Sequence, residues 1–304
     1  MSYLAATTLE QALAAVADGA RPVAGGSDLV VAARQGKAPL PEALVALHRL
    51  HDLGAIEADG DGVRIGALAR HADIEASPLL AGRFSALADG SALVGSPSTR
   101  NVGTLGGNVM NGSPAMDTGA PLIVLEAEVE LRSHDAARRV PVAELWTGPG
   151  RTSARADELC VAVHIPGPAA GAGSAYVRLE YRRAMEIAVV GAAAYVVVAD
   201  DGTMEDCRIA LAAVAPTIIR APQAEQAISG RLPAPQALAA VASGASEASR
   251  PIGDLRGSEA YRRHTVGVVA QRAVAVAARR ASGATVPVPA NRARGIGVPF
   301  GESA

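Results

Sequence analysis

Apolar residues recur every three or four positions over residues 9–16, a spacing that predicts a helix with one buried face. Thr7 or Thr8 stands directly before this segment and would cap its first turn. A short strand is predicted over 22–24, and Ser27 is placed to cap a second helix that begins directly after it. These elements predict a small α/β unit at the start of the chain.

Two long apolar stretches, 189–199 and 204–214, flank the turn residues 200–202, which read Asp-Asp-Gly. Asp and Gly tolerate the positive φ of a tight turn, so these stretches are predicted to form a β-hairpin. A long helix is predicted from about 258 to 279. After Gly283 the chain is rich in proline and glycine, and we expect an extended tail that lies on a partner.

The middle of the chain alternates short strands, such as 63–65, with helices that include 79–93. A turn-rich break at 59–62 marks a boundary between segments. Residues 95–117 are dense in Gly, Ser, Asn and Pro, a composition typical of surface loops. The pattern divides the chain into segments 1–58, 59–175, 176–282 and 283–304.

Charge and composition narrow the function classes. The 304 residues carry a net charge of −2 and only 3% are aromatic, which argues against a nucleic-acid-binding surface. With 49% hydrophobic and 19% charged residues, the chain is expected to fold. The longest apolar run, 187–199, is shorter than the roughly 18 residues that a membrane span needs, so we interpret it as a buried strand.

The counts of cysteine and lysine exclude several chemistries. Cys160 and Cys207 are the only cysteines, too few for an iron–sulfur cluster or a Cys-rich zinc site held by this chain. Lys37 is the only lysine, which argues against a phosphate loop of the GK[ST] type and a Schiff-base lysine. The start of the chain lacks a basic stretch followed by an apolar one, so we expect a cytoplasmic protein in a reducing compartment.

The first candidate site is a glycine pair between a strand and a helix. Bare backbone N–H groups at the positive end of a helix can bind a diphosphate. Asp28 would be repelled by a diphosphate and is better suited to accept from a sugar hydroxyl or a ring N–H. An ordinary strand–helix turn is the alternative. The candidate residues are Pro22, Val23, Ala24, Gly25, Gly26, Ser27, Asp28 and Leu29.

The second candidate is another glycine pair, followed by an acid. Its backbone would approach a ligand closely, Thr104 and Asn108 would supply polar side chains, and Asp117 would be a fixed acceptor. Two such loops could converge on one extended dinucleotide, although each could also be a structural turn. The candidate residues are Thr104, Leu105, Gly106, Gly107, Asn108 and Asp117.

The third candidate is Arg178, in a run of charged residues before the apolar stretch 187–199. A guanidinium near a flavin ring would stabilise the anionic reduced form and raise its reduction potential. A solvated or ion-paired surface cluster is the alternative. His48 and His51 have no further ligand at metal spacing, and Cys160 lies in an apolar stretch where packing is the expected role, so no metal site is assigned.

Five stretches resemble one family, the FAD-binding medium subunits of molybdenum hydroxylases such as xanthine dehydrogenase and carbon monoxide dehydrogenase. They are AGGSDL at 24–29, IGALARHADI at 65–74, GSPSTRNVGTLGGNVMNGSPAMD at 95–117, YVRLEYRRAMEIAVV at 176–190 and SEAYRRH at 258–264. They occur in the family's order over about the first 280 residues.

The resemblance implies an α+β protein with the PCMH-type FAD-binding fold. Segments 1–58 and 59–175 would be two FAD-binding subdomains, 176–282 an antiparallel sheet with helices, and 283–304 the tail. FAD would be bound non-covalently, because Ser27 and Asp28 replace the histidine of covalently flavinylated relatives. Its diphosphate would lie on the two glycine loops.

The same resemblance points to three charged positions. Asp117 matches the family's cofactor-binding acid. Arg178 falls where many members carry a lysine near the flavin, and Glu186 stands where aspartate is usual. No residue of this chain is assigned to the hydroxylation itself.

The implied function is electron transfer within an oxidoreductase. Electrons would pass from a molybdenum cofactor in a large subunit, through two [2Fe–2S] clusters in a small subunit, to FAD in this chain and then to an external acceptor. The assembly would be a dimer of heterotrimers that oxidises xanthine, an N-heterocycle or an aldehyde. Alternatives are the medium subunit of a carbon monoxide dehydrogenase, a stand-alone FAD oxidase and a non-catalytic assembly subunit.

Overall fold

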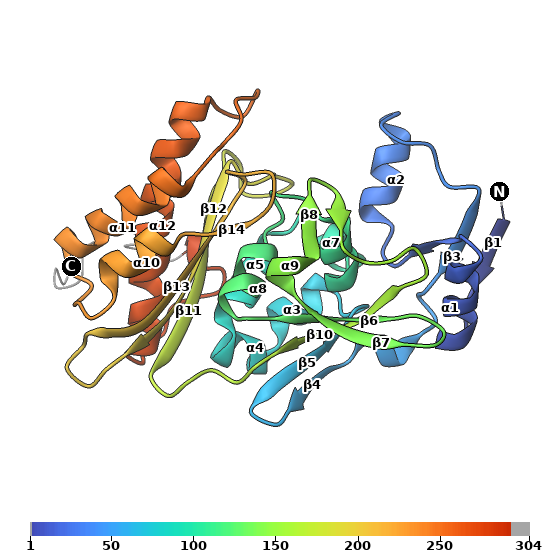
Figure 1. Cartoon of the computed structure of the whole chain (residues 1–304), viewed down its shortest axis with the longest axis horizontal. Coiled ribbons are helices and arrows are strands. Elements are labelled where there is room, and N and C mark those ends of the chain that lie inside the picture. The colour runs from blue at the N-terminus through green and yellow to red at the C-terminus, as the bar shows by residue number, and fades with distance from the viewer. Residues whose placement is uncertain (1, 293–304) are drawn as a thin grey trace. The chain divides into compact units, whose positions relative to one another are not determined.

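The computed structural model describes residues 2–292 and confirms the predicted mixed α+β architecture (Figure 1). The chain forms two compact units, each assembled from three stretches. Unit 1 comprises Met1–Asp73, Pro97–Ser113 and Glu126–Gly167, and unit 2 comprises Ile74–Ser96, Pro114–Leu125 and Pro168–Ala304. The contiguous segments predicted from the sequence, 1–58, 59–175, 176–282 and 283–304, stay predictions.

Unit 1 contains three sheets and short helices. Its elements are β1 (Ser2–Ala5), α1 (Leu9–Ala17), β2 (Arg21–Val23), α2 (Ser27–Arg34), β3 (Ala43–Ala46), η1 (His51–Gly54), β4 (Ile56–Asp59), β5 (Gly62–Gly66), α6 (Pro97–Arg100), α7 (Leu105–Asn111), β6 (Glu128–Arg132), β7 (Ala137–Pro141), α9 (Val142–Leu145), β8 (Trp146–Gly148), β9 (Arg151–Thr152) and β10 (Leu159–Ile165). Helix α3 (His71–Ala76) crosses from unit 1 into unit 2.

Unit 2 contains one sheet and the longer helices. Its elements are α4 (Pro78–Arg83), α5 (Ser85–Leu93), α8 (Gly119–Val124), β11 (Ala172–Leu179), β12 (Val190–Val198), β13 (Met204–Ala212), β14 (Ile219–Arg220), α10 (Pro222–Ile228), α11 (Pro235–Ala248), α12 (Glu259–Ala281) and η2 (Ala290–Arg292). Among the helices within 2–292, none has the length and apolar character that a membrane crossing needs.

The first sheet is parallel, with strand order β1-β3-β2. Helix α1 begins as predicted, since Thr8 accepts a hydrogen bond from the backbone N–H of Gln11 at 3.3 Å. The prediction that Ser27 caps α2 is wrong. Gly26 occupies the N-cap position with φ of 68°, and Ser27 is the first residue of the helix. The chain turns there through the left-handed region, which glycine adopts without a Cβ penalty.

The second sheet is antiparallel, with strand order β4-β5-β10-β6-β7. Its central strand β10 pairs with β5 and β6, so that Val163 lies between Ile65 and Val129. All three are buried. Side chains alternate between the two faces of a strand, so His164 and its neighbours Arg64 and Glu128 lie on the opposite, polar face.

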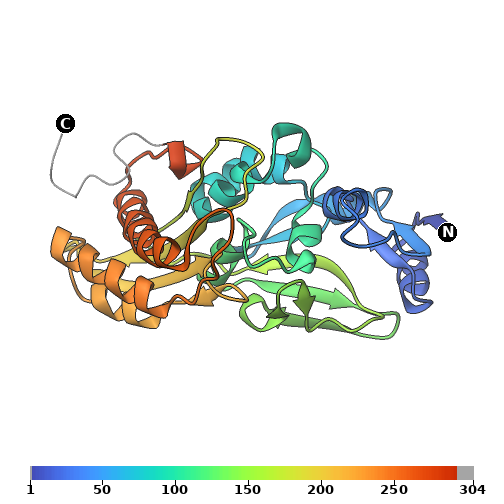
Figure 2. The same cartoon turned by 90° about the horizontal axis from the view of Figure 1, so that it is seen from above.

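The sheet of unit 2 is antiparallel, with strand order β11-β12-β13-β14, and confirms the predicted hairpin. Helices α10, α11 and α12 cover one face, whereas α5 and α8 contact the other (Figure 2). Strand β12 is therefore buried on both faces, which explains its continuous apolar run.

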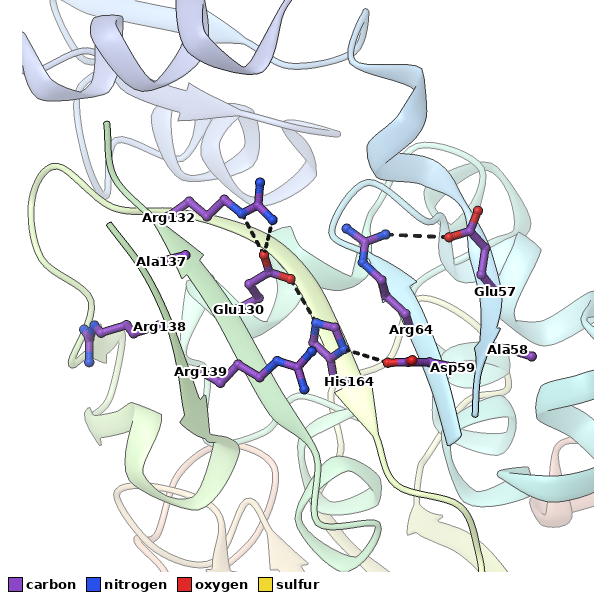
Figure 3. Close-up of a pocket in the computed structure, with 10 residues that line it drawn as sticks. All are labelled: Glu57, Ala58, Asp59, Arg64, Glu130, Arg132, Ala137, Arg138, Arg139 and His164. Carbon is purple, nitrogen blue, oxygen red and sulfur yellow. Dashed lines mark hydrogen bonds and ion pairs between the residues drawn. The ribbon is translucent and has the colours of Figure 1, made fainter. Parts of the chain in front are cut away.

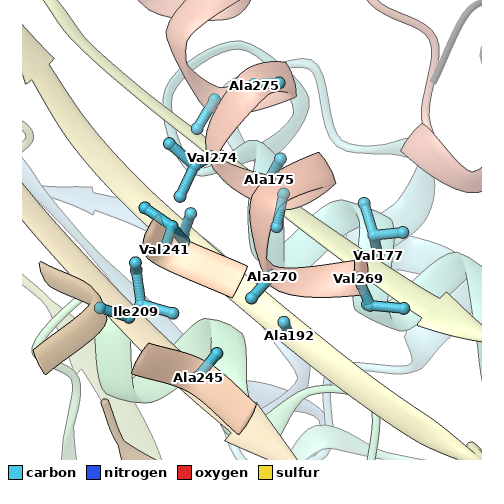
Figure 4. Packing of buried hydrophobic residues seen from close by; sticks show 14 of the residues in the cluster. Ala175, Val177, Ala192, Ile209, Val241, Ala245, Val269, Ala270, Val274 and Ala275 are labelled. Carbon is cyan, nitrogen blue, oxygen red and sulfur yellow. The ribbon is translucent and has the colours of Figure 1, made fainter. Parts of the chain in front are cut away.

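Small residues fill the layer between this sheet and α12 (Figure 4). Ala192 and Ala175 on the strands face Ala270 and Val269 of the helix, and all are buried. At Gly173 any side chain would overlap the backbone of Ala277 in α12. The alanines and this glycine let the helix lie close to the sheet.

The start of the tail lies against unit 2 of the same chain. Val286 and Ala290 are buried in the hydrophobic core of this unit, and the Arg280 side chain donates to the carbonyl oxygen of Pro287 at 3.1 Å. The described part of the tail is therefore anchored by its own chain, and the expected contact with a partner stays a prediction. The rest of the predicted tail, 293–304, lies outside the described residues.

A buried carboxylate ties the tail to the core of unit 2. Asp89 in α5 is 0% exposed and forms an ion pair with Arg280 of α12, with 2.6 Å between Oδ2 and Nη1. Its two oxygens also accept hydrogen bonds from the backbone N–H groups of Tyr176 and Ala290. One side chain thus joins a helix, an edge strand and the tail.

We predict that Asp89→Ala strongly destabilises the protein. The substitution leaves the Arg280 guanidinium buried without its counter-charge, a change that costs about 3–5 kcal/mol. Chemical denaturation measures this loss directly. As a control, Asp206→Ala removes the partly exposed Asp206–Arg208 pair and is expected to cost less than about 1 kcal/mol. Equal losses for the two variants would contradict the prediction.

Candidate functional site

The two predicted glycine loops lie together in unit 1. A side chain at Gly25 would overlap the carbonyl oxygen of Val102, and its Cβ would lie 3.1 Å from the Cα of Gly103. A Cβ at Gly103 would in turn lie 3.6 Å from the hydroxyl oxygen of Ser27. Gly25 is therefore needed because the two loops approach each other closely. The sequence had suggested instead that its bare backbone approaches a ligand.

The second loop starts α7 and is capped by its own threonine. Thr104 accepts a hydrogen bond from the backbone N–H of Gly107 at 3.2 Å. Gly106 is buried against Ala67, whose Cβ would be 2.6 Å from an added Cβ. Gly107, in contrast, is exposed and would meet only the Thr104 hydroxyl at 2.9 Å and Ala24 at 3.9 Å.

Two glycines thus present open backbone. Around Gly26 an added Cβ would meet only Val23 and Val30 side chains, at 3.5 and 3.8 Å. No side chain caps the first turn of α2. The first turn of α2 thus has no side-chain cap, Gly107 is exposed, and the two loops to which they belong touch. Such a cradle fits an anionic group.

The remaining residues of the first loop surround this cradle. Pro22 and Val23 end β2, Ala24 lies beside Gly107, and Leu29 lies in the first turn of α2. Asp28 has an exposed surface, yet partial loss of hydration raises the pKa of its carboxyl. In the second loop Leu105 is buried, and Asn108 is half-buried one residue after Gly107.

Asp117 and Arg178 form a buried cluster in unit 2. The Arg178 Nη1 atom donates to Oδ2 of Asp117 at 2.6 Å, and the Tyr176 hydroxyl donates to Oδ1 at 2.9 Å. Arg178 is 3% exposed and Asp117 6% exposed. On its other side Arg178 Nε donates to Glu180 at 2.9 Å. The guanidinium is therefore shared between two carboxylates.

The spacing along β11 builds this cluster. Tyr176 and Arg178 are two residues apart in a strand, so their side chains project from the same face. Both reach Asp117, which lies two residues before the start of α8. A side chain at Gly191, opposite Arg178 on β12, would overlap the Tyr176 hydroxyl, and one at Gly90 would overlap the backbone of Asp117. Two missing side chains make room for the network.

Burial sets the protonation of this network. It raises the pKa of Tyr176 well above its usual value, aided by the charge of Asp117, so the hydroxyl keeps the proton that it donates. Burial also raises the pKa of Asp117, while Arg178 and Tyr176 oppose that effect. Arg178 Nη2 is buried 2.8 Å from Glu180 Oε2 without a well-aligned hydrogen bond. This nitrogen is therefore ion-paired with Glu180 and closed to solvent.

Glu186 contacts Arg178 and Arg182. Its carbonyl oxygen accepts from Arg178 Nη1 at 3.3 Å, and its side chain pairs with Arg182 at 3.3 Å. Its carboxylate thus faces a neighbouring arginine of the segment between β11 and β12.

A hollow of about 540 Å³ lies on the polar face of the sheet β4-β5-β10-β6-β7 (Figure 3). Its charges are largely paired with one another. Glu130 bonds His164 at 2.9 Å and Arg132 at 2.7 Å. None of the predicted site residues lines it. Within residues 2–292 no group of three or more His, Cys, Asp or Glu side chains is arranged to hold a metal ion.

The two cysteines are packed side chains. Cys160 and Cys207 are both buried and unbonded. Burial raises the pKa of the Cys160 thiol to about 12, which leaves it protonated at neutral pH. The structure agrees with a packing role for Cys160.

Two family models cover most of the chain. The model described as the FAD binding domain in molybdopterin dehydrogenase matches residues 1–168, and the CO dehydrogenase flavoprotein C-terminal domain matches residues 175–277. The chain belongs to the FAD-binding medium subunits of the molybdenum hydroxylases. It is a subunit of a molybdenum-containing dehydrogenase and binds FAD through the first of these domains.

Individual relatives agree with this family. A putative xanthine dehydrogenase FAD-binding subunit of Escherichia coli (strain K12) is 32% identical over 286 residues, 93% of this chain and 97% of that protein. The carbon monoxide dehydrogenase medium chain of Hydrogenophaga pseudoflava is 33% identical over 256 residues, 84% and 88% of the two chains. Among solved structures, a chain of carbon monoxide dehydrogenase from the same organism gives a TM-score of 0.87 at 32% identity, covering 92% of this chain and 98% of that chain.

Sequence reasoning missed two residues of this FAD-binding subunit. Tyr176 completes the Asp117 network, and its spacing of two from Arg178 was the available signal for one face of a strand. His71 lies beside the second glycine loop. Its backbone N–H donates to the Gly103 carbonyl at 3.1 Å, its ring Nδ1 has no partner, and it is 1% exposed. Nothing in the local pattern marks His71 as buried.

His71 should make the protein less stable in mild acid. Burial, with a smaller effect of Arg100, lowers its pKa from 6.5 to about 4. Below pH 6.5 the unfolded chain therefore binds a proton at His71 that the folded chain does not bind. The free energy of unfolding falls as the pH drops from 6.5 towards 4, by up to about 1.4 kcal/mol per pH unit. Between pH 7 and 5, His71→Gln should lose about 2 kcal/mol less than the parent protein.

Urea denaturation at the two pH values measures this difference. His134→Gln is the matched control, because its side chain is 70% exposed, and it should keep the parental pH dependence. The same pH-dependent loss in His71→Gln as in the parent would contradict a neutral, buried His71.

Proposed function

We propose that this chain is the electron-transfer subunit of a heterotrimeric molybdenum hydroxylase of the xanthine, N-heterocycle or aldehyde type. It would take electrons from the [2Fe–2S] clusters of a small subunit and pass them through FAD to an external acceptor. A large subunit would hold the molybdenum cofactor. The relatives support this proposal, since they include xanthine and carbon monoxide dehydrogenase subunits.

The contact between the two glycine loops carries the proposal. Gly26 and Gly107 present open backbone, and the first turn of α2 has no side-chain cap. Backbone N–H groups at a helix start bind phosphate without adding side-chain charge, so this cradle would hold the diphosphate of FAD. Asp28 would accept a hydrogen bond from a hydroxyl or a ring N–H of the cofactor.

Arg178 and Asp117 would act at the flavin ring. When bound, FAD supplies reversible redox chemistry. A fixed guanidinium favours the anionic reduced form and thus raises the reduction potential. The positive charge of Arg178 would act on the flavin from its buried position, while Asp117 and Tyr176 hold the guanidinium in place. Sharing with Glu180 moderates its charge.

The partners follow from the family. We propose a dimer of heterotrimers, each with a small iron–sulfur subunit and a large molybdopterin subunit, in the cytoplasm. The carbon monoxide dehydrogenase medium chain remains the alternative. The fold does not separate the two, because carbon monoxide dehydrogenase of Hydrogenophaga pseudoflava and quinoline 2-oxidoreductase of Pseudomonas putida 86 both give a TM-score of 0.87. Ser27-Asp28-Leu29 favours the xanthine-type group, because carbon monoxide members often carry His-Ser-Leu at this position.

We predict that Gly107→Val abolishes FAD binding but leaves the chain folded. The new side chain enters the exposed side of the loop, and its clash with the Thr104 hydroxyl loosens a helix cap worth about 1 kcal/mol. The complex should be purified from its host and its acid-released FAD quantified per chain, together with the free energy of unfolding.

Gly54→Val is the matched control, because Gly54 also lies in unit 1 and has no atom within 4 Å of an added Cβ. It should retain FAD. Full flavin content in Gly107→Val would contradict the role of this loop in FAD binding. An intact complex with unchanged activity and no flavin on this chain, in the parent as in the variant, would favour the assembly-subunit alternative.

A further inference from the structure

The C-terminal segment binds the backbone of Arg178 through the side chain of Asn291. The Asn291 side-chain Oδ1 accepts a hydrogen bond from the Arg178 backbone N–H at 3.0 Å, and its Nδ2 donates to the Arg178 carbonyl oxygen at 2.9 Å. Both polar groups of one strand residue are therefore satisfied by one side chain 113 positions later. The two bonds fix the orientation of the amide, because a flipped amide would lose both.

These two hydrogen bonds take the place of pairing with a further strand. β11 is the edge strand of its sheet, so the outward N–H and C=O groups of Arg178 have no strand partner. Asn291 supplies the donor and acceptor that a further strand would provide. Edge strands otherwise shift more easily than central strands, and a shift at Arg178 would move the guanidinium that holds Asp117.

Asn291 is itself held at fixed points. The preceding residue, Ala290, is buried and donates its N–H to Asp89 at 2.9 Å. Asp89 also accepts the backbone N–H of Tyr176 on β11 at 3.0 Å. The tail and the strand are thus tied at two places on β11, at Tyr176 and at Arg178, whose side chains meet at Asp117.

We propose that Asn291 is a positioning residue for Arg178 and that the C-terminal segment thereby tunes the flavin. The inference rests on the proposed function, in which Arg178 acts at the flavin ring. Asn291 itself touches only the backbone of Arg178 among the predicted site residues. Its contribution is to fix the point from which the guanidinium projects.

The test is the flavin reduction potential of the purified complex, determined by spectroelectrochemical titration. Arg178→Gln removes the cation and should lower the potential. Asn291→Ala should lower it in the same direction by a smaller amount, with FAD still bound. Asn291→Asp, which keeps the side-chain shape but opposes the Arg178 carbonyl with an acceptor, should also lower it. Arg292→Gln is the matched control at the next, exposed residue and should keep the parental potential.

The outcomes separate the inference from the proposed function. If Arg178→Gln lowers the potential and both Asn291 variants keep it, the positioning role of Asn291 is wrong and the role of Arg178 stands. If Arg178→Gln keeps the parental potential with FAD bound, Arg178 has no electrostatic role at the flavin and the inference fails with it. A complex without FAD would overturn the proposed function itself.

Discussion

A single buried carboxylate, that of Asp117, determines the arrangement of the Tyr176–Asp117–Arg178 cluster in unit 2. A buried charge is tolerated only when it is paired and hydrogen-bonded, and Asp117 receives one donor on each oxygen, from Tyr176 and Arg178. The surrounding chain is shaped to allow this. Gly90 and Gly191 lack the side chains that would block it. Fixing the two strand residues also fixes the guanidinium that we assign to the flavin.

Unit 1 depends on a different constraint, the close approach of two backbones. Gly25 and Gly106 are needed because protein atoms occupy the positions of their side chains. Gly26 and Gly107 have open surroundings, and these are the positions left for a ligand. Each glycine pair thus contains one residue required for packing and one available for binding. This division would account for a Gly-Gly pair in each loop if the loops hold the cofactor as we propose.

Much of the fold could be predicted from the sequence, since local periodicity and turn residues specify its elements. The Asp-Gly turn at 200–202 and the helix after Ser258 are examples, each with a strong local signal. The helix Pro235–Ala248 was not predicted, and its sequence is dominated by alanine, glycine and serine. The cap of α2 was assigned one residue late, since Ser is the commoner cap and only the backbone turn at Gly26 decides. The hydrogen bond between Tyr176 and Asp117 joins residues 59 positions apart, and those between Asn291 and Arg178 join residues 113 positions apart. No local pattern encodes such pairs.

The most direct measurement is the cofactor content of the complex purified from its native host. We predict flavin absorption bands, about one acid-released FAD per copy of this chain, and iron and molybdenum that co-purify with two further polypeptides. The acid-released flavin would show that FAD is bound non-covalently. A colourless chain that takes up no added FAD would contradict the proposal, and both glycine loops would then serve packing alone.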